Sequence, residues 1–193
     1  MQVLFLFMKI IKSFKTTNWS GGKTTEMFIY PKNSNYADRN FDFRISSASV
    51  EVEESDFTDL TGFHRLLTII DGQLELSVNN ETPFVLEKDV SFWFSGSDKV
   101  KSRGIVRDFN VIFSDKYEVQ WRLIKEDEVL KTQLNQGDFL FYFLVKGQVK
   151  MKEQSIYENE LVCFNFEEYT EFENTITFEN DNRLYEIFIQ LMS

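Results

Sequence analysis

Apolar and polar residues alternate with a period of two in several short runs of this chain. The clearest runs cover residues 41–46, 74–79 and 149–152. Successive side chains of a β-strand point to opposite faces of a sheet, so this period predicts half-buried strands. No window of helical length carries an apolar stripe with a period of 3.6 residues, and residues 125–134 are expected to form only a short helix or turn. The chain is therefore predicted to be all-β.

A weak internal repeat indicates how these strands are organised. Residues 66–78 read LLTIIDGQLELSV and residues 141–152 read FYFLVKGQVKMK. Each copy has an apolar strand, a charged residue, Gly-Gln and an alternating strand, with Gly72 and Gly147 expected at tight turns. A second apolar strand opened by an acidic residue follows in both copies, at residues 89–94 and 160–164. The pattern favours two copies of a small β-barrel, although a chance similarity between two hairpins remains open at this point.

Composition agrees with a globular protein that is rich in strands. Of the 193 residues, 42% are hydrophobic and 21 are Phe, whereas only 2 are Pro. A chain of this length buries roughly 70% of its unfolded surface when it packs as one unit. The sequence therefore has room for one large domain or two small ones.

The formal net charge of −10 narrows the range of partners. Such an average field repels phosphate backbones and anionic membranes, so neither nucleic acid nor a membrane is expected as a partner. A small basic pocket for an anionic ligand remains compatible with it. The apolar N-terminus is interrupted by Lys9 and lacks the features of a signal peptide, so we interpret residues 3–14 as a strand of a cytoplasmic protein.

Three pairs of polar residues have the i, i+2 spacing that places both side chains on one face of a strand. These pairs are Thr24 with Glu26, Arg44 with Ser46, and Asp108 with Asn110. The opposite faces carry apolar residues that we expect in the core, namely Met27 and Ile29, Phe43 and Ile45, and Phe109 and Val111. Each polar face would be the solvated outside of a sheet or the inside of a barrel. In the second case the pairs would converge on one concavity.

Four ordered motifs resemble those of the HutD/Ves family. Trp19 with residues 21–26 resembles its opening W followed by G-G-x-T-R-E, with Thr25 where Arg is common. Residues 43–48 resemble its W-R-x-S-x-A strand, with Phe43 in place of Trp. Gly62-Phe63-His64-Arg65 resembles its G-x-x-R segment, and residues 107–111 match its R-D-F-N-[VL] signature. The order and approximate spacing agree over residues 14–113.

The resemblance implies that residues 1–193 form a single HutD/Ves-like bicupin unit, a tandem cupin of two β-barrel or jelly-roll halves. The first half would span about 14–118 and the second about 119–193, with the N-terminal strand 3–14 able to join the second. The resemblance also implies a small-ligand pocket in the first barrel and a link to histidine catabolism or its regulation.

Metal-dependent and nucleophilic chemistry find little support in the residue types. Many cupins hold a metal through two or three His and a Glu, but this chain has one His, His64, which we interpret as a surface turn residue. We therefore expect no metal and no other cofactor. Ser46 and Ser47 lack a G-x-S-x-G elbow. Cys163, the one cysteine, lies in an apolar run and is interpreted as a buried small hydrophobe rather than a reactive thiol.

The favoured hypothesis is a metal-independent binding module for a small carboxylate or amino-acid derivative, in a sensing or regulatory role. Arg44 or Arg65 would grip the carboxylate, because a guanidinium matches its two oxygens. Histidine-catabolism intermediates such as urocanate or N-formylglutamate follow from the resemblance. The expected ligand-binding residues are Trp19, Thr24, Glu26, Arg44, Ser46, Arg65, Asp108 and Asn110.

Two alternatives remain open. In the first, the protein is an enzyme in which Glu26 and Asp108 share acid–base chemistry on a small polar substrate, with burial raising the pKa of one carboxyl and Arg44 lowering that of the other. In the second, it has a structural or protein-interaction role. The abundant Phe residues would also suit the surface of a homodimer.

Overall fold

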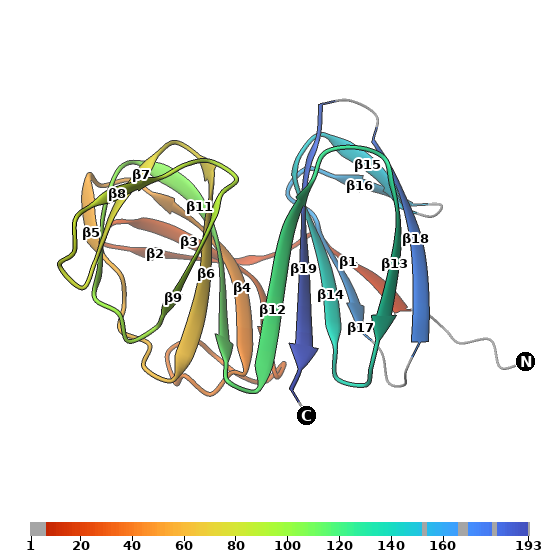
Figure 1. Cartoon of the computed structure of the whole chain (residues 1–193), viewed down its shortest axis with the longest axis horizontal. Helices are drawn as coiled ribbons and strands as arrows, with labels where there is room; N and C mark the ends of the chain where they lie inside the picture. Colours follow the sequence, from red (N-terminus) through yellow and green to blue (C-terminus); the bar gives the residue numbers. More distant parts are fainter. Residues whose placement is uncertain (1–6, 152–153, 166–169, 179–180, 193) are drawn as a thin grey trace, which may run out of the picture. The chain divides into compact units, whose positions relative to one another are not determined.

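The computed structural model describes residues 7–151, 154–165, 170–178 and 181–192. The regular secondary structure within these ranges consists of β-strands alone. The chain divides into two compact units, whose strands are labelled in Figure 1. We call residues 13–117 the first unit. The second unit combines the segment up to Lys12 with the residues from Glu118 onward. The prediction of an all-β chain is confirmed.

The first unit contains two antiparallel sheets. The strands of its six-stranded sheet are, in spatial order, β2 (Lys15–Trp19), β3 (Gly22–Tyr30), β4 (Phe43–Val50), β11 (Val106–Ser114), β6 (Phe63–Asp71) and β9 (Ser91–Ser95). Those of its four-stranded sheet are β5 (Glu54–Asp56), β10 (Val100–Arg103), β7 (Leu74–Val78) and β8 (Phe84–Leu86). Leu67 and Ile69 of the larger sheet pack with Leu74 and Leu76 of the smaller one in a single apolar core. The two sheets therefore stack face to face.

The second unit is built in the same way. Its five-stranded sheet has the order β1 (Phe7–Ile11), β17 (Leu161–Asn165), β14 (Phe139–Lys146), β19 (Arg183–Leu191) and β12 (Tyr117–Ile124). Its four-stranded sheet has the order β13 (Glu128–Leu134), β18 (Thr170–Phe178), β15 (Gln148–Met151) and β16 (Gln154–Tyr157). The core between these sheets is apolar and includes Leu140, Leu144, Val149 and Met151.

The internal repeat of the sequence corresponds to a repeat of eight strands. The order β4-β11-β6-β9 recurs as β12-β19-β14-β17, and the order β5-β10-β7-β8 recurs as β13-β18-β15-β16. Gly72 and Gly147 lie at the equivalent turn in the two copies, with φ of 86° and 90°, a backbone conformation that favours glycine. Each copy is a jelly-roll sandwich of two sheets rather than one sheet closed into a barrel.

Two local predictions differ from the structure. Residues 128–134, expected in a short helix or turn, form β13 and pair with β18 along their whole length. Leu130 and Leu134 are four residues apart, a spacing that also suits a helix, and pairing with a distant strand decides between the two. At the N-terminus the described strand is β1, which ends at Ile11 rather than at residue 14. Residues 1–6 lie outside the described part of the chain, and β1 pairs with β17.

A β-bulge corrects one face assignment. The pairing of β3 with β4 shifts between Glu26 and Phe28, so Ile29 stands opposite Arg44. Directly paired residues of an antiparallel sheet share a face, so Ile29 lies on the same face as Glu26 and Arg44 rather than opposite them. The extra residue of the bulge reverses the alternation that the sequence pattern predicts.

Candidate functional site

Polar side chains cross the inward face of the six-stranded sheet in the first unit. Glu26 of β3, Ser46 of β4 and Asn110 of β11 stand in one row of directly paired residues. Leu67 of β6 continues the same row and belongs to the core between the sheets, which shows that this face points inward. The row therefore places polar groups inside the sandwich, beside its apolar core.

Two arginines occupy the neighbouring row. Arg44 of β4 and Arg65 of β6 both pair with Ile112 of β11, one from each side. Both arginines are buried, and so are Ser46, Asp108 and Asn110. For these residues the interpretation as a solvated outer sheet face is wrong, because the pairing register turns them toward the core.

Arg44 is held by three neighbours. Its Nε donates to Oε2 of Glu26 at 2.8 Å, and its Nη1 donates to Oγ of Ser46 at 3.1 Å. The ring of Tyr36 lies 4.6 Å from the guanidinium carbon, within the range of a cation–π contact. Glu26 neutralises the charge of Arg44, so these residues form a fixed cluster within the protein.

Arg65 has a different environment. Its guanidinium carbon lies 4.7 Å from the ring centre of Phe57 and 5.0 Å from that of Phe94. Within the described ranges it makes no hydrogen bond or ion pair, and its Nε is buried without an acceptor. Burial lowers the pKa of Arg65 to about 10, which leaves the side chain cationic at neutral pH. Arg65 is therefore a buried cation whose hydrogen-bonding capacity is unused by its described neighbours.

Asp108 is a buried carboxylate with one hydrogen-bond donor. Its Oδ1 accepts from the backbone N–H of Ala48 at 2.8 Å. Burial raises the pKa of Asp108 to about 6, against the opposing effects of the Ala48 hydrogen bond and of three nearby arginines, Arg65, Arg107 and Arg44. Asp108 thus exchanges its proton close to neutral pH.

Regular alternation along β11 aims Asp108 inward, and the irregularity in its pairing with β6 lies at Ile70 of β6. The pairing of β11 with β6 shifts between Arg107 and Asp108, after which Asp108 stands opposite the core residue Ile69. The hydroxyl of Ser47, on the outward face of β4, donates to the backbone carbonyl of Asp108 at 2.6 Å. This hydrogen bond holds the backbone of Asp108 against β4.

Asn110 lies two residues further along β11, on the same face as Asp108. Its Oδ1 is buried and accepts no hydrogen bond from the residues that the structure describes. A buried acceptor without a donor is costly, so such atoms are uncommon in folded proteins. Asp108 and Asn110 therefore present two incompletely satisfied acceptors to the interior.

The remaining two residues expected in the site lie on its margin. Thr24 stands opposite Ala48 in the pairing of β3 with β4 and is partly buried. Trp19, at the end of the edge strand β2, is 40% exposed and packs closely against Gly21. The structure thus joins Glu26, Arg44 and Ser46 by direct contact, while Trp19 stays at the sheet edge.

Sequence reasoning missed the aromatic residues that pack on the arginines. Tyr36 and Phe57 lie outside the strands, where a period-two pattern assigns no face. Phe94 belongs to an expected strand but carried no signal that would pair it with Arg65. Only the folded arrangement brings these rings onto the guanidinium groups.

The other residues weighed for chemistry take no part in this cluster. Among the described residues, no group of three or more His, Cys, Asp or Glu side chains is placed to hold a metal ion. His64 is an exposed strand residue whose Nε2 lies 2.6 Å from Oδ1 of Asp115. Cys163 is buried, and burial raises the pKa of its thiol to about 12, which confirms its interpretation as a buried small hydrophobe. In the described part of the chain, no helix is long and apolar enough to cross a membrane.

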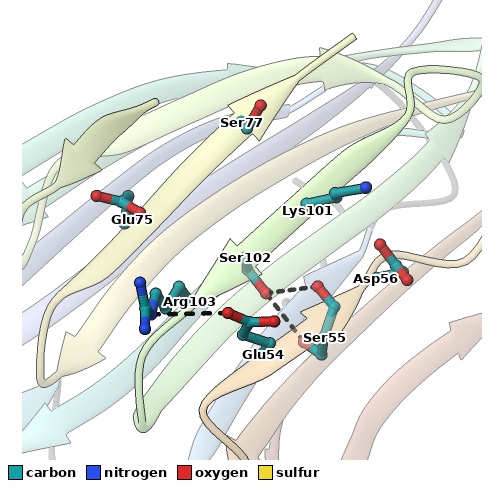
Figure 2. Close-up of a pocket in the computed structure, with 8 residues that line it drawn as sticks. All are labelled: Glu54, Ser55, Asp56, Glu75, Ser77, Lys101, Ser102 and Arg103. Atoms are coloured by element: carbon teal, nitrogen blue, oxygen red, sulfur yellow. Dashed lines mark hydrogen bonds and ion pairs between the residues drawn. The ribbon is translucent and has the colours of Figure 1, made fainter. Parts of the chain in front are cut away.

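A separate hollow of about 480 Å³ lies on the four-stranded sheet of the first unit (Figure 2). Its lining comes from β5, β7 and β10, and Figure 2 shows the Arg103–Glu54 ion pair and the Ser55–Ser102 contact at its centre. Five of the eight lining residues are exposed, among them Glu75. Exposed charges in water bind ligands weakly, so we place the candidate site at the buried cluster around Arg65.

The second unit does not repeat this cluster. When the copies are aligned on Gly72 and Gly147, Leu140 takes the place of Arg65, and the pairing register puts Leu184 in the place of Asp108. Glu186 corresponds to Asn110, but Arg122 engages its two carboxylate oxygens at 2.6 and 3.4 Å. The second copy therefore lacks the combination of Arg65, Asp108 and Asn110 that the first copy carries.

Two stacked antiparallel sheets in this strand order, present twice in one chain, define a tandem cupin fold. YhhW from Escherichia coli is similar, with a TM-score of 0.67 and 11% identity over 96% of this chain and 99% of its own. No curated protein sequence matches the chain.

The chain belongs to the HutD family, because the HutD family model matches residues 11–182. The structure is similar to that of HutD from Pseudomonas fluorescens SBW25, with a TM-score of 0.82 and 21% identity over 97% of this chain and 100% of that one. It is also similar to PA5104, a conserved protein of unknown function from Pseudomonas aeruginosa PAO1, with a TM-score of 0.81 and 18% identity over 95% and 99% of the two chains. The assignment suggested by the four sequence motifs is confirmed.

Proposed function

We propose that this HutD-type cupin binds a small carboxylate or amino-acid derivative at the buried cluster of the first unit, without a metal, in a sensing or regulatory role. The observation that carries the proposal is the state of Arg65, a buried cation without a hydrogen-bond acceptor in the described part of the chain. A carboxylate offers the two oxygens that a guanidinium recognises.

Arg65 is a better anchor than Arg44, the other arginine expected to grip the ligand. Arg44 already spends its Nε on Glu26 and its Nη1 on Ser46. A ligand carboxylate at Arg44 would have to compete with Glu26, whereas at Arg65 it would replace no protein contact. A hydrogen bond to a charged group contributes about 1.5–3 kcal/mol. A ligand at Arg44 would first lose the Arg44–Glu26 hydrogen bond, so binding at Arg65 is favoured by about that amount.

The surroundings of Arg65 limit the size and shape of the ligand. Phe57 and Phe94 pack on the guanidinium, and Leu67 lies on the same face of the sheet. These groups suit a compact acid with a planar or apolar part. The family assignment points to urocanate and N-formylglutamate as the first compounds to test.

Thermal-shift screening tests the proposal. We expect one of these compounds to raise the Tm of the wild-type protein, because a ligand at 100 times its Kd stabilises the folded state by about 2.7 kcal/mol. In Arg65→Leu the shift should disappear. Leucine is a conservative choice at this place, since the second unit has Leu140 at the equivalent position.

Arg103→Gln is the matched control, because Arg103 lines the hollow of Figure 2 on the four-stranded sheet, whereas Arg65 belongs to the six-stranded sheet. It should keep the full ligand response. The proposal fails if no compound stabilises the wild type, or if Arg65→Leu responds as the wild type does. Loss of the response in Arg103→Gln alone would move the site to the hollow.

One observation favours a second candidate function, acid–base catalysis on a small polar substrate. Burial raises the pKa of Asp108 to about 6, while Glu26 is ion-paired with Arg44 at 2.8 Å. Two carboxyl groups in such different environments can divide the roles of proton donor and acceptor. Following a stabilising compound by NMR in the presence of the protein distinguishes the two functions. Conversion that Asp108→Asn abolishes would establish an enzyme, and an unchanged compound would leave binding alone.

A further inference from the structure

Asp108 differs from the other fully buried aspartate of the described chain, Asp138. Asp138 accepts backbone N–H groups from Asn135 at 2.8 Å and from Leu191 at 3.0 Å, one on each of its oxygens. Asp108 accepts only the N–H of Ala48, on Oδ1, and its Oδ2 has no donor among the described residues. Both carboxylate oxygens of Asp138 thus accept backbone hydrogen bonds, whereas the Asp108 carboxylate can accept further hydrogen bonds from a ligand.

Asn110 adds a second unmatched acceptor beside it. The two residues are separated by one position on β11, so their side chains point to the same inward face. The Oδ1 of Asn110 is buried without a described donor. Two acceptor oxygens on one face match a ligand that carries N–H groups.

The two arginines that face Asp108 from neighbouring strands donate no hydrogen bond to it within the described residues. From β6 it faces Arg65 and from β4 Arg44, and Arg107 precedes it on β11, each acting on it by charge. Arg44 is turned to Glu26 of β3, and Arg107 donates from Nε to Ser47 at 3.4 Å on the opposite face. Neither Arg44 nor Arg65 donates a hydrogen bond to the Asp108 carboxylate within the described residues.

We propose that Asp108 and Asn110 form an N–H recognition subsite, and that a ligand binds it only when Asp108 is ionised. The inference rests on the proposed function and deepens it, because Arg65 then holds the carboxylate of the same ligand. The recognised class is a compact acid that also carries an amide, amino or imidazole N–H. A carboxylic acid without an N–H group would contact Arg65 but leave Asp108 and Asn110 without a donor.

Proton linkage follows from this arrangement. The ligand N–H and the proton of Asp108 compete for the same acceptor oxygens, so binding below the pKa of Asp108, about 6, releases a proton. Affinity should fall by about fourfold between pH 7.5 and 5.5, with release of about 0.8 proton at pH 5.5. An acid without N–H has the opposite effect, because its negative charge raises the pKa of Asp108 and binding takes up a proton.

Isothermal titration calorimetry at pH 5.5 and 7.5, in buffers of different ionisation enthalpy, measures both quantities. The probes are N-formylglutamate and glutarate, which has the same carbon chain without the nitrogen. The carboxyl groups of the probes also release protons on binding at pH 5.5, so the contribution of Asp108 is the difference in proton release between the wild type and Asp108→Asn. This pH stays above the isoelectric point of about 4.7. We expect N-formylglutamate to bind more tightly and to release more protons with the wild type than with Asp108→Asn at pH 5.5, and glutarate to bind weakly without this excess.

Two variants complete the experiment. Asp108→Asn imitates the protonated carboxyl and should bind N-formylglutamate weakly, with an affinity that no longer depends on pH. Asp56→Asn, in the exposed hollow of Figure 2, should retain the wild-type linkage. Equal proton release by the wild type and Asp108→Asn when N-formylglutamate binds, or equal binding of glutarate, overturns this inference and leaves the proposed function standing. Failure of both probes to bind the wild type at pH 7.5 counts against both.

Discussion

The substitution Asp108→Asn should stabilise the folded protein at neutral pH. The pKa of Asp108 is about 6 in the fold against an ordinary value of 3.8, so the folded state holds the proton more tightly than the unfolded state does. Between these two values the folded protein binds more protons, and its stability therefore falls as the pH rises. Asparagine keeps the shape of the side chain and removes the buried charge.

The magnitude follows from the two pKa values. A difference of about two units corresponds to roughly 3 kcal/mol of stability that is lost once Asp108 is ionised. Asparagine can still accept the N–H of Ala48, but its own amide group must be buried, at a cost of about 1 kcal/mol. We expect a net gain of about 1–3 kcal/mol at pH 7.5, which raises the Tm by several degrees in a chain of this size.

Urea unfolding of the wild type and Asp108→Asn at pH 5.0, 6.0 and 7.5 measures this difference. About half of the effect should be present at pH 5.0 and all of it at pH 7.5. Asp56→Asn, an exposed aspartate on the same unit, controls for the loss of one negative charge. The reasoning is refuted if Asp108→Asn is less stable than the wild type at pH 7.5, or if their difference is the same at every pH.

Three further predictions concern other positions. Arg65→Leu should raise the free energy of unfolding by about 1–2 kcal/mol while it removes ligand binding, because the cost of burying the charge exceeds its two cation–π contacts; unchanged or lower stability in urea would contradict this. Gly147→Ala should destabilise by about 2 kcal/mol or more, since a Cβ would overlap the side chain of Asn182, whereas Gly62→Ala has open space and should cost about 1 kcal/mol for its positive φ. Equal losses in Tm would show that steric overlap is unimportant there. Cys163 should react with a thiol reagent only when its unit opens, so fast labelling of the native protein at pH 8 would contradict its burial.

Strand content and the repeat could be predicted from the sequence because they depend on local pattern. Alternation over residues 74–78 and 148–151 marks β7 and β15, and Gly72 and Gly147 mark the turns before them. Period two and positive φ are properties of a few neighbouring residues, so they leave a trace in the sequence. The expectation of a short helix or turn at residues 125–134 was wrong at 128–134, because β13 depends on pairing with the distant strand β18.

The candidate site could be predicted in part. The i, i+2 pairs on β4 and β11 correctly placed Arg44 with Ser46 and Asp108 with Asn110, because alternation alone sets the shared face. Alternation could not show whether that face of the sheet lies in solvent or inside the sandwich. Nor could it anticipate the bulge that returns Ile29 to the face of Glu26.

The sequence by itself determined that the chain is all-β, that its strand pattern occurs twice, and which polar side chains share a face of one strand. Only the tertiary structure decided that Arg44 is neutralised by Glu26 while Arg65, between Phe57 and Phe94, is left without an acceptor in the described chain. The two arginines look alike as residues in alternating strands. Their difference arises from pairing register and burial, which join positions far apart in the chain and set the local dielectric, and neither is a property of a short segment.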